Sequence, residues 1–185
     1  MIQGLLLAAG RSRRFGTDKR WATVSGRPMA LHSALQCRAA LAQVLVVLRG
    51  EDAELAALLL QAGMAFTHCP ESARGMGHSL AHGVRHTAQA AGWVIGLADM
   101  PLLRPASIAA VAQAVAAGRI VVPQHLGQRG HPVGFDRAFG PDLMALQGDS
   151  GARGVLKAHP HAVQALELDD PGVLLDVDLP EQLPR

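Results

Sequence analysis

The first segment whose residue types suit chemistry follows an apolar run near the start of the chain. The run ends in Ala9-Gly10, whose small side chains let a ligand approach the backbone, and a loop with several arginines then leads to Lys19. Free backbone N–H groups beside cationic side chains are suited to hold a polyphosphate. The loop has neither the Walker A pattern nor Gly-x-Gly-x-x-Gly. A solvated basic turn is the alternative interpretation.

Carboxylates follow two later apolar runs. Asp99 comes directly after residues 93–98, and Asp176 and Asp178 lie at the end of residues 173–177, which we predict to be a strand. Strand alternation would put Asp176 and Asp178 on one side. If that strand lies beside the one that ends at Asp99, carboxylates from distant parts of the chain would hold one Mg²⁺ beside substrate phosphates. For Asp99, the alternative is a helix cap or a turn.

Two glycine-containing segments resemble binding loops. Gly75 to Ser79 leads into a predicted helix, so free N–H groups and the positive end of the helix dipole face whatever lies in front of them. Gly130-His131-Pro132 precedes a short predicted strand, and its neighbouring Arg and His suit an anionic substrate. Either segment is equally well explained as a plain connecting loop.

Histidine and cysteine spacing does not favour other chemistry. His78, His82 and His86 recur every four residues, which spreads them over about 12 Å of helix, too far for one zinc ion. A partly solvated helix face is the better interpretation. Cys37 and Cys69 form no Cys-x-x-Cys pair and suggest no Cys-His nucleophile, so a reducing cytoplasm is the compartment we expect.

Short Val-, Leu- and Ile-rich runs alternate with longer Ala-rich stretches, which is typical of a mostly parallel sheet covered by helices on both faces. We predict one three-layer α/β/α, Rossmann-like domain over residues 1–185, with ligands at the carboxyl ends of the strands. The predicted strands are residues 4–9, 43–48, 65–67, 93–98, 120–123, 133–135, 163–168 and 173–177. The predicted helices are residues 29–42, 52–62, 77–91, 105–117, 139–146 and 152–158.

Composition excludes several classes of protein. Aromatic residues make up only 3% of the 185 residues, with no Tyr, which argues against readers of RNA or single-stranded DNA that stack bases on aromatic side chains. The formal net charge of +2 does not indicate a nucleic-acid partner either. No apolar run approaches the roughly 18 residues that span a bilayer. The apolar start lacks a preceding basic region and therefore does not match a signal peptide.

Several motifs, each weak alone, occur in an order that resembles the MobA-like nucleotidyltransferases and, within them, the molybdenum cofactor cytidylyltransferase branch. They are Leu7-Ala8-Ala9-Gly10 with Ser12, Gly16 and Lys19; Gly26-Arg27-Pro28-Met29; Gly75-Met76-Gly77-His78-Ser79-Leu80; Asp99-Met100-Pro101; Gly130-His131-Pro132; residues 148–153; and Asp176-Val177-Asp178-Leu179-Pro180-Glu181. The second Ala of the first motif and Gly130-His131-Pro132 favour the cytidylyl branch. Phe15 stands where the family usually has Met, and Leu179 where it usually has Thr.

The resemblance implies transfer of CMP from CTP to the phosphate of the molybdopterin cofactor, with release of pyrophosphate and with Mg²⁺ as the cofactor. It implies catalytic roles for Arg11, Lys19 and Asp99, and metal ligation by Asp99 and Asp178, with Asp176 a candidate behind them. Acceptor binding falls to Gly130, His131 and Pro132. The implied nucleotide-binding residues are Leu7, Ala8, Ala9, Gly10, Arg11, Lys19, Gly75 and Ser79. With so few aromatic residues, backbone edges at residues 8–10 are expected to read the base, with Phe15 the one possible exception.

Other substrates and other functions are also compatible with these motifs. GTP in place of CTP, or a sugar phosphate or other small phosphate as acceptor, would keep the chemistry and change the substrates. A nucleotide- or cofactor-binding accessory protein would keep the loops without turnover, although Lys19, Asp99 and Asp178 together favour catalysis. An oxidoreductase is disfavoured because the dinucleotide fingerprint is missing. A molybdoenzyme or its chaperone is the further partner that the resemblance suggests, with no nucleic acid and no membrane.

Overall fold

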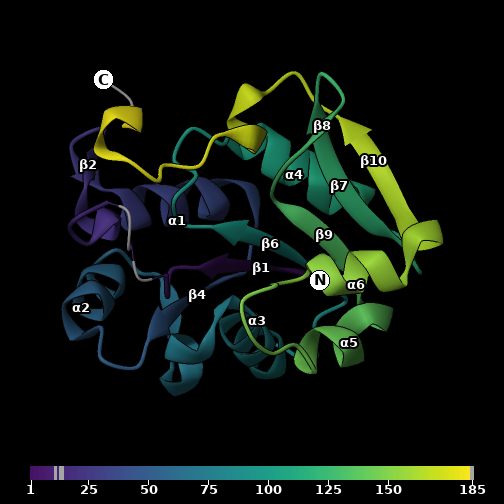
Figure 1. The fold of residues 1–185 in the computed structure, drawn as a ribbon, viewed down its shortest axis with the longest axis horizontal. Coiled ribbons are helices and arrows are strands. Elements are labelled where there is room, and N and C mark those ends of the chain that lie inside the picture. The colour runs from purple at the N-terminus through teal and green to yellow at the C-terminus, as the bar shows by residue number, and fades with distance from the viewer. Residues whose placement is uncertain (11, 13–14, 184–185) are drawn as a thin grey trace.

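The computed structural model describes residues 1–10, 12 and 15–183. Its main sheet has the strand order β10-β7-β9-β6-β1-β4-β5, with β8 paired to β7 at one end, and a separate two-stranded sheet joins β2 to β3 (Figure 1). The strands of the main sheet are β1 (Ile2–Leu7), β4 (Val44–Arg49), β5 (Ala65–Cys69), β6 (Gly92–Leu97), β7 (Ile120–His125), β8 (Gln128–Arg129), β9 (Val133–Asp136) and β10 (Val163–Glu167). The small sheet consists of β2 (Thr23–Val24) and β3 (Arg27–Pro28).

The neighbouring strands β6, β1, β4 and β5 are parallel, and β10 is parallel to β7. Strand β9 runs antiparallel to both β6 and β7, and β8 is antiparallel to β7. The predicted mostly parallel α/β sheet is therefore confirmed. Because β1, β4 and β6 are parallel neighbours, the loops that follow them emerge at the same edge of the sheet.

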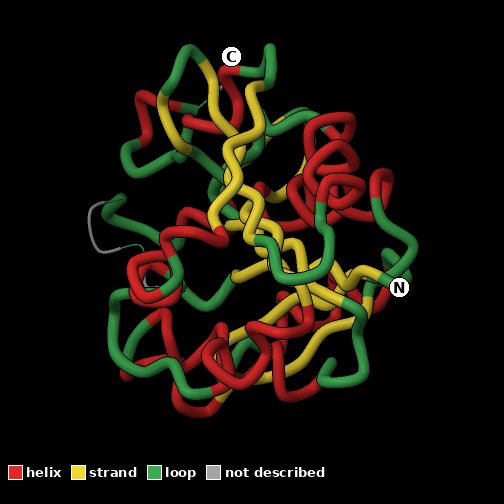
Figure 2. Tube along the Cα trace, turned by 90° about the vertical axis from the view of Figure 1, so that its right-hand side faces the viewer, coloured by secondary structure: helices red, strands yellow, loops and turns green. Residues whose placement is uncertain are grey.

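Helices cover both faces of the sheet, as the edge-on view shows (Figure 2). The helices are α1 (Met29–Ala40), α2 (Ala53–Gln61), α3 (Met76–His86), α4 (Pro105–Ala114), α5 (Gly140–Met144) and α6 (Arg153–Ala158). Residues of α1, α2 and α4 share one hydrophobic cluster with the sheet, and residues of α3, α5 and α6 share a second. These two cores give the three layers that the alternation of strands and helices predicts.

Alternation within β1 explains how one strand serves both cores. Leu5 and Leu7 belong to the cluster with α3, whereas Leu6 between them belongs to the cluster with α1, and all three are less than a tenth exposed. Successive side chains of a strand point to opposite faces. A strand buried on both sides therefore needs an unbroken apolar run, which is the pattern that the sequence has there.

The strand predicted at residues 173–177 is not formed. Pro171–Leu174 is instead a 3-10 helix, and the chain then runs on without regular structure to residue 179. Buried Asp170 caps this turn by accepting a hydrogen bond from the Gly172 N–H at 2.9 Å. Val173 and Val177 are both buried, one in the large core and one in a small separate cluster. The spacing of the apolar residues therefore reflects two separately buried valine side chains and not a strand.

The segment after β10 crosses back over the molecule. The yellow end of the ribbon leaves the β10 side and reaches the region of β2 and α1 (Figure 1). The Val177 N–H donates to the Asp99 carbonyl at 2.8 Å, which fixes this segment against the end of β6. Over the described residues, no helix has the length and apolar character required to cross a membrane.

Candidate active site

A cavity of about 380 Å³ opens where the central parallel strands end. Loops after β1 and β6, the start of α3 and the C-terminal segment all contribute to its walls. Every predicted nucleotide- or metal-binding residue that the structure describes lines it: Leu7, Ala8, Ala9, Gly10, Lys19, Gly75, Ser79, Asp99 and Asp178. Arg11, the remaining predicted residue of this set, lies outside the described residues.

Lys19 joins the two predicted metal-binding carboxylates. Its Nζ donates to Asp99 Oδ2 at 2.7 Å, to Asp178 Oδ1 at 2.9 Å and to the Val177 carbonyl at 2.8 Å. Lys19 begins a short 3-10 helix, Lys19–Trp21, and is only 8% exposed. Its own backbone N–H donates to Ser12 Oγ at 3.2 Å. The three donor positions of the ammonium are therefore all used, which holds its charge at one place.

These contacts also determine the charge of Lys19. Burial by itself lowers the pKa of Lys19, but the charges of Asp99 and Asp178 and their hydrogen bonds outweigh this, so the pKa lies above its ordinary value. The side chain is consequently a permanent cation near neutral pH. A cation of this kind can stabilise negative charge on phosphate oxygens, and it cannot serve as a general base.

The arrangement of Asp99 and Asp178 suits a divalent cation. Asp99 Oδ1 is buried and accepts no hydrogen bond within the described part of the chain. Such an atom is costly unless a cation or donor approaches it. Two carboxylates that offer oxygen atoms at one place match the preference of Mg²⁺, whose remaining positions are commonly taken by water and substrate phosphates. The two residues therefore fit the predicted metal site.

Asp176 does not join this pair. It is exposed, while Asp178 two residues later is half-buried and faces Lys19. The predicted strand alternation would have placed both on one side, and it fails because the segment is irregular there. The proximity that the strand was expected to create between Asp99 and Asp178 nevertheless exists, because the Val177 N–H bonds the Asp99 carbonyl.

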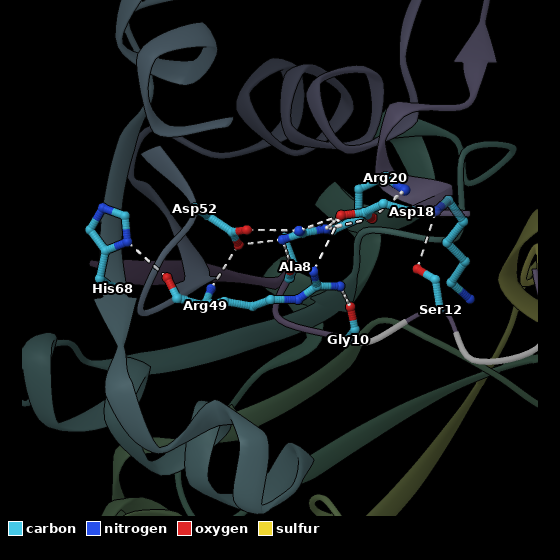
Figure 3. Close-up of polar contacts among 9 residues, drawn as sticks. Ala8, Gly10, Ser12, Asp18, Arg20, Arg49, Asp52 and His68 are labelled. Atoms are coloured by element: carbon cyan, nitrogen blue, oxygen red, sulfur yellow. Dashed lines mark hydrogen bonds and ion pairs between the residues drawn. The ribbon is translucent and has the colours of Figure 1, made fainter. Parts of the chain in front are cut away.

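A partly buried network of charges lies next to the loop after β1 (Figure 3). The Arg20 guanidinium, whose side chain is 5% exposed, donates to Asp18 Oδ1 at 2.9 Å, to Asp52 Oδ1 at 2.8 Å and to the Ala8 carbonyl at 2.8 Å. Arg49, at the end of β4, contacts Asp18 at 3.3 Å. Sequence reasoning missed this network. Asp18 and Arg20 flank Lys19 of the first motif, but Arg49 and Asp52 stand beside no recognisable motif, and only the sheet brings β4 and the start of α2 next to the loop.

We expect Asp52→Asn to lower the free energy of unfolding at pH 7 by about 3 kcal/mol, because it leaves buried Arg20 short of a charged partner. Burial alone would raise the pKa of Asp52, but hydrogen bonds and charges from Arg20 and Arg49 hold it below the usual 3.8. A lowered folded-state pKa contributes stability above the unfolded value, and that contribution is lost as the pH falls through the folded value. Urea unfolding should therefore show the difference between the two proteins shrinking below about pH 4. A difference independent of pH down to complete acid unfolding would contradict this assignment.

The opposite wall of the cavity depends on close backbone packing. Gly75 has a φ of 126°, and a Cβ there would lie 2.4 Å from the carbonyl group of Gly148. The Gly77 N–H donates to the Gly148 carbonyl at 2.7 Å. Asp149, which belongs to the motif at residues 148–153, also lines the cavity, although no binding role was predicted for it. Ser79 also lines the cavity, but it is only 3% exposed.

The predicted acceptor-binding residues Gly130, His131 and Pro132 do not line this cavity. Gly130 packs against the C-terminal segment, where a Cβ would lie 2.0 Å from the Val173 carbonyl oxygen, and the His131 N–H donates to that oxygen at 2.9 Å. Burial lowers the pKa of His131, although the charges of Asp99 and Asp176 oppose this. A neutral imidazole therefore lies within electrostatic reach of Asp99, next to the cavity.

Phe15 packs with the small cluster of Val24, Met29 and Val177, and it does not line the cavity. The one aromatic residue in the loop that was predicted to hold the nucleotide therefore gives no stacking platform in the cavity. Cys37 is free and buried, and burial raises its pKa to about 12. Cys69 is also free and buried, and neither thiol is suited to act as a nucleophile.

The histidines of α3 make separate contacts. His82 Nε2 lies 2.9 Å from Thr67 Oγ1, and the rings of His82 and His86 pack at a centroid distance of 4.1 Å. His78 instead approaches Glu71 at 3.8 Å. Within the described residues, no group of three or more His, Cys, Asp or Glu side chains is arranged to hold a metal ion.

A model of the MobA-like NTP transferase domain matches residues 4–163. The purine catabolism protein PucB of Bacillus subtilis is 36% identical over 97% of this chain and 92% of its own length. A probable molybdenum cofactor guanylyltransferase of Chloroflexus aggregans is 36% identical over 69% of this chain and 62% of its own length.

A solved structure agrees in fold along almost the whole chain. Rv0371c of Mycobacterium tuberculosis, at 29% identity, superimposes with a TM-score of 0.83 over 98% of this chain and 94% of its own. A complex of that protein with manganese matches at 27% identity and a TM-score of 0.81, covering 98% and 95% of the two chains. The family match covers most of the chain, and the loops after β1 and β6 form one cavity as its motifs predict. The chain belongs to the MobA-like NTP transferase family of nucleotidyltransferases.

Proposed function

We propose that this protein transfers CMP from CTP to the phosphate of molybdopterin and releases pyrophosphate, with Mg²⁺ held by Asp99 and Asp178. The observation that carries this proposal is the Lys19 ammonium shared by Asp99 and Asp178 in the wall of a cavity that the Gly10 and Gly75 loops also line. Positive charge, carboxylates and exposed loop backbone at one place are what binding of a metal-bound triphosphate requires.

The reaction needs little from the protein beyond position and charge. A phosphate oxygen of the acceptor forms a bond to the α-phosphorus of CTP, and the bond from that phosphorus to the bridging oxygen breaks, so that pyrophosphate leaves. The attacking oxygen is already an anion, so no general base is required. Bound Mg²⁺ supplies neutralisation of charge on the phosphates. Lys19 adds a fixed positive charge, and Arg11 is proposed to add a second.

Gly10 and its neighbours are proposed to hold the nucleotide, with Gly75 and Ser79 on the other wall. His131, with Gly130 and Pro132, is proposed to face the acceptor, because its neutral ring lies beside the cavity and within electrostatic reach of Asp99. We further propose that residues 1–185 act as one cytoplasmic domain that passes its product to a molybdoenzyme or its chaperone. The name of the Chloroflexus relative supports a molybdopterin-type acceptor.

GTP is the second candidate nucleotide, because that same relative is named as a guanylyltransferase. The Ala8-Ala9-Gly10 loop favours CTP, since guanylyltransferases of the MobA-like superfamily usually have a second Gly in place of Ala9.

The experiment that tests the proposal offers each nucleoside triphosphate separately, with Mg²⁺ and molybdopterin, and measures pyrophosphate. We expect release with CTP and none when molybdopterin is omitted or replaced by a sugar phosphate. Release with GTP alone would overturn the choice of base. Release with a sugar phosphate alone would overturn the acceptor. Tight binding of CTP without pyrophosphate would identify an accessory protein in place of an enzyme.

A further inference from the structure

Buried Arg20 and half-buried Arg49 bond the carbonyl groups of the loop that lines the cavity. Arg20 Nη1 donates to the Ala8 carbonyl at 2.8 Å, and Arg49 Nη2 donates to the Gly10 carbonyl. These two arginines come from different elements, the 3-10 helix that begins at Lys19 and the end of β4. Figure 3 shows both side chains reaching the loop, and Asp52, the residue before α2, contacts the Arg20 guanidinium.

The arginines are themselves held in place. Asp18 bonds Arg20 and Arg49, and Asp52 accepts from the Arg20 guanidinium and, at 2.9 Å, from the Arg49 backbone N–H. His68 on β5 fixes the same strand end, since its Nδ1 lies 2.8 Å from the Arg49 carbonyl. A planar guanidinium bonded to two carboxylates, as that of Arg20 is, keeps a defined orientation, and Arg49 is held by Asp18 through its side chain and by Asp52 through its backbone.

The Arg49 guanidinium does not use all of its hydrogen-bond donors. Its Nε is buried and has no hydrogen-bond partner in the described residues. A buried donor left without a partner is unfavourable. The position of this guanidinium is therefore set by the Gly10 carbonyl and Asp18, even though one of its donors is left unused.

The arginines decide which polar groups of the loop stay available to a ligand. A trans peptide is planar, with its C=O and the following N–H on opposite sides, so the bond from Arg20 to the Ala8 carbonyl also fixes the direction of the Ala9 N–H. The N–H groups of Ala9 and Gly10 donate to no residue that the structure describes, whereas the Ala8 N–H is used by the Val47 carbonyl. The loop thus offers donors, while two of its acceptors are engaged by charged groups.

We propose that Arg20 and Arg49 are positioning residues that make the loop at residues 8–10 selective for a base whose edge presents acceptors. The proposal rests on the nucleotide site proposed above. On its Watson–Crick edge, which we propose the loop reads, cytosine presents the acceptors N3 and O2 beside the N4 amino group. The same edge of guanine presents O6 and the two donors N1–H and N2, which need acceptors, and Arg20 and Arg49 each take up part of the acceptor capacity of a loop carbonyl. The charge network therefore selects cytosine over guanine without touching the base.

The test compares the affinity of CTP and of GTP, each with Mg²⁺, for the wild type and for Arg49→Met, Arg49→Lys and Arg38→Met. Arg49→Met removes the donors and keeps an apolar stem, and Arg49→Lys keeps the charge with a single donor group. Arg38→Met is the matched control, because the Arg38 guanidinium also donates to a backbone carbonyl, that of Ala62 after α2. Isothermal titration measures binding without turnover, and the melting temperature of each variant is recorded in parallel.

We expect the wild type and Arg38→Met to prefer CTP, and Arg49→Met to bind CTP about 10-fold more weakly with most of the preference lost. Arg49→Lys should fall between them. An unchanged ratio of CTP to GTP affinity in both Arg49 variants, with only a lower melting temperature, would overturn the proposal. A wild type that prefers GTP would overturn it as well. A CTP preference without pyrophosphate release would instead refute the proposed reaction and leave the positioning role standing.

Discussion

Asp99→Asn is expected to reduce the rate of pyrophosphate release by roughly 10³-fold or more, the largest effect that the structure predicts for one substitution. Asp99 offers a buried oxygen, Oδ1, that no described residue bonds, and its other oxygen already accepts from Lys19. Removing the negative charge leaves the proposed metal site with Asp178 alone from this pair. The measurement is single-turnover release of pyrophosphate from CTP, at Mg²⁺ concentrations high enough to saturate the wild type.

The variant should remain folded. Lys19 keeps its bonds to Asp178 and to the Val177 carbonyl, and Asn has the shape of Asp. We expect the free energy of unfolding to change by about 1 kcal/mol or less. Binding of Mn²⁺ alone, followed by its paramagnetic resonance signal, should weaken at the same time. Normal turnover by a folded Asp99→Asn protein would remove Asp99 from the metal site.

Lys19→Met is expected to lower the rate by about 10²- to 10³-fold, because it deletes a fixed positive charge beside the reacting phosphates. Its effect on metal binding should be opposite to that of Asp99→Asn. In the wild type the ammonium and a metal ion compete for the same two carboxylates. Without the ammonium, Asp99 and Asp178 face one another with less compensating charge, so the variant should bind Mn²⁺ more tightly.

Measurements of the free energy of unfolding distinguish a catalytic role of Lys19 from a purely structural one. Removing the cation between two partly buried carboxylates is expected to cost about 3 kcal/mol without metal, and saturating Mg²⁺ should recover more stability in the variant than in the wild type. Lys19→Arg keeps the charge and should restore stability more completely than activity, because a planar fork does not reproduce the three bonds of the ammonium. A loss of stability that Mg²⁺ does not reverse, together with a rate loss of the same free energy, would assign Lys19 to the fold alone.

The sequence predicted the architecture well because its signals are local. An apolar run such as Leu5-Leu6-Leu7 is typical of a strand buried on both faces, and every predicted helix overlaps an observed one, although the helix predicted to end at residue 91 ends at His86. The antiparallel direction of β9 has no local signature, since strand direction depends on the connections around it. The strand predicted at residues 173–177 was wrong for a different reason. Two buried valines four residues apart can each be buried without a strand between them.

The residues of the candidate site also fall into those that the sequence predicts and those that it does not. Gly10, Lys19, Asp99 and Asp178 belong to motifs that can be read along the chain, and the structure brings them around one cavity. The arginine network could not be predicted, because Arg49 belongs to β4 and its significance arises only from the neighbouring loop. Gly130-His131-Pro132 is the opposite case. The motif can be recognised in the sequence, but in the structure its backbone packs against Val173 and does not line the cavity.

The bonds of Lys19 span 80 residues to Asp99 and 159 to Asp178. The first separation is no longer than that between paired residues of β1 and β6, such as Gly4 and Val94, so Asp99 is positioned with the sheet, whereas the bond to Asp178 closes a much longer loop. The sheet can assemble from β1 to β10 before the irregular segment that carries Asp178 settles against the end of β6. During synthesis, the pocket therefore gains its second carboxylate only after the scaffold exists. A partly made chain would have a nearly complete fold and half of a metal site.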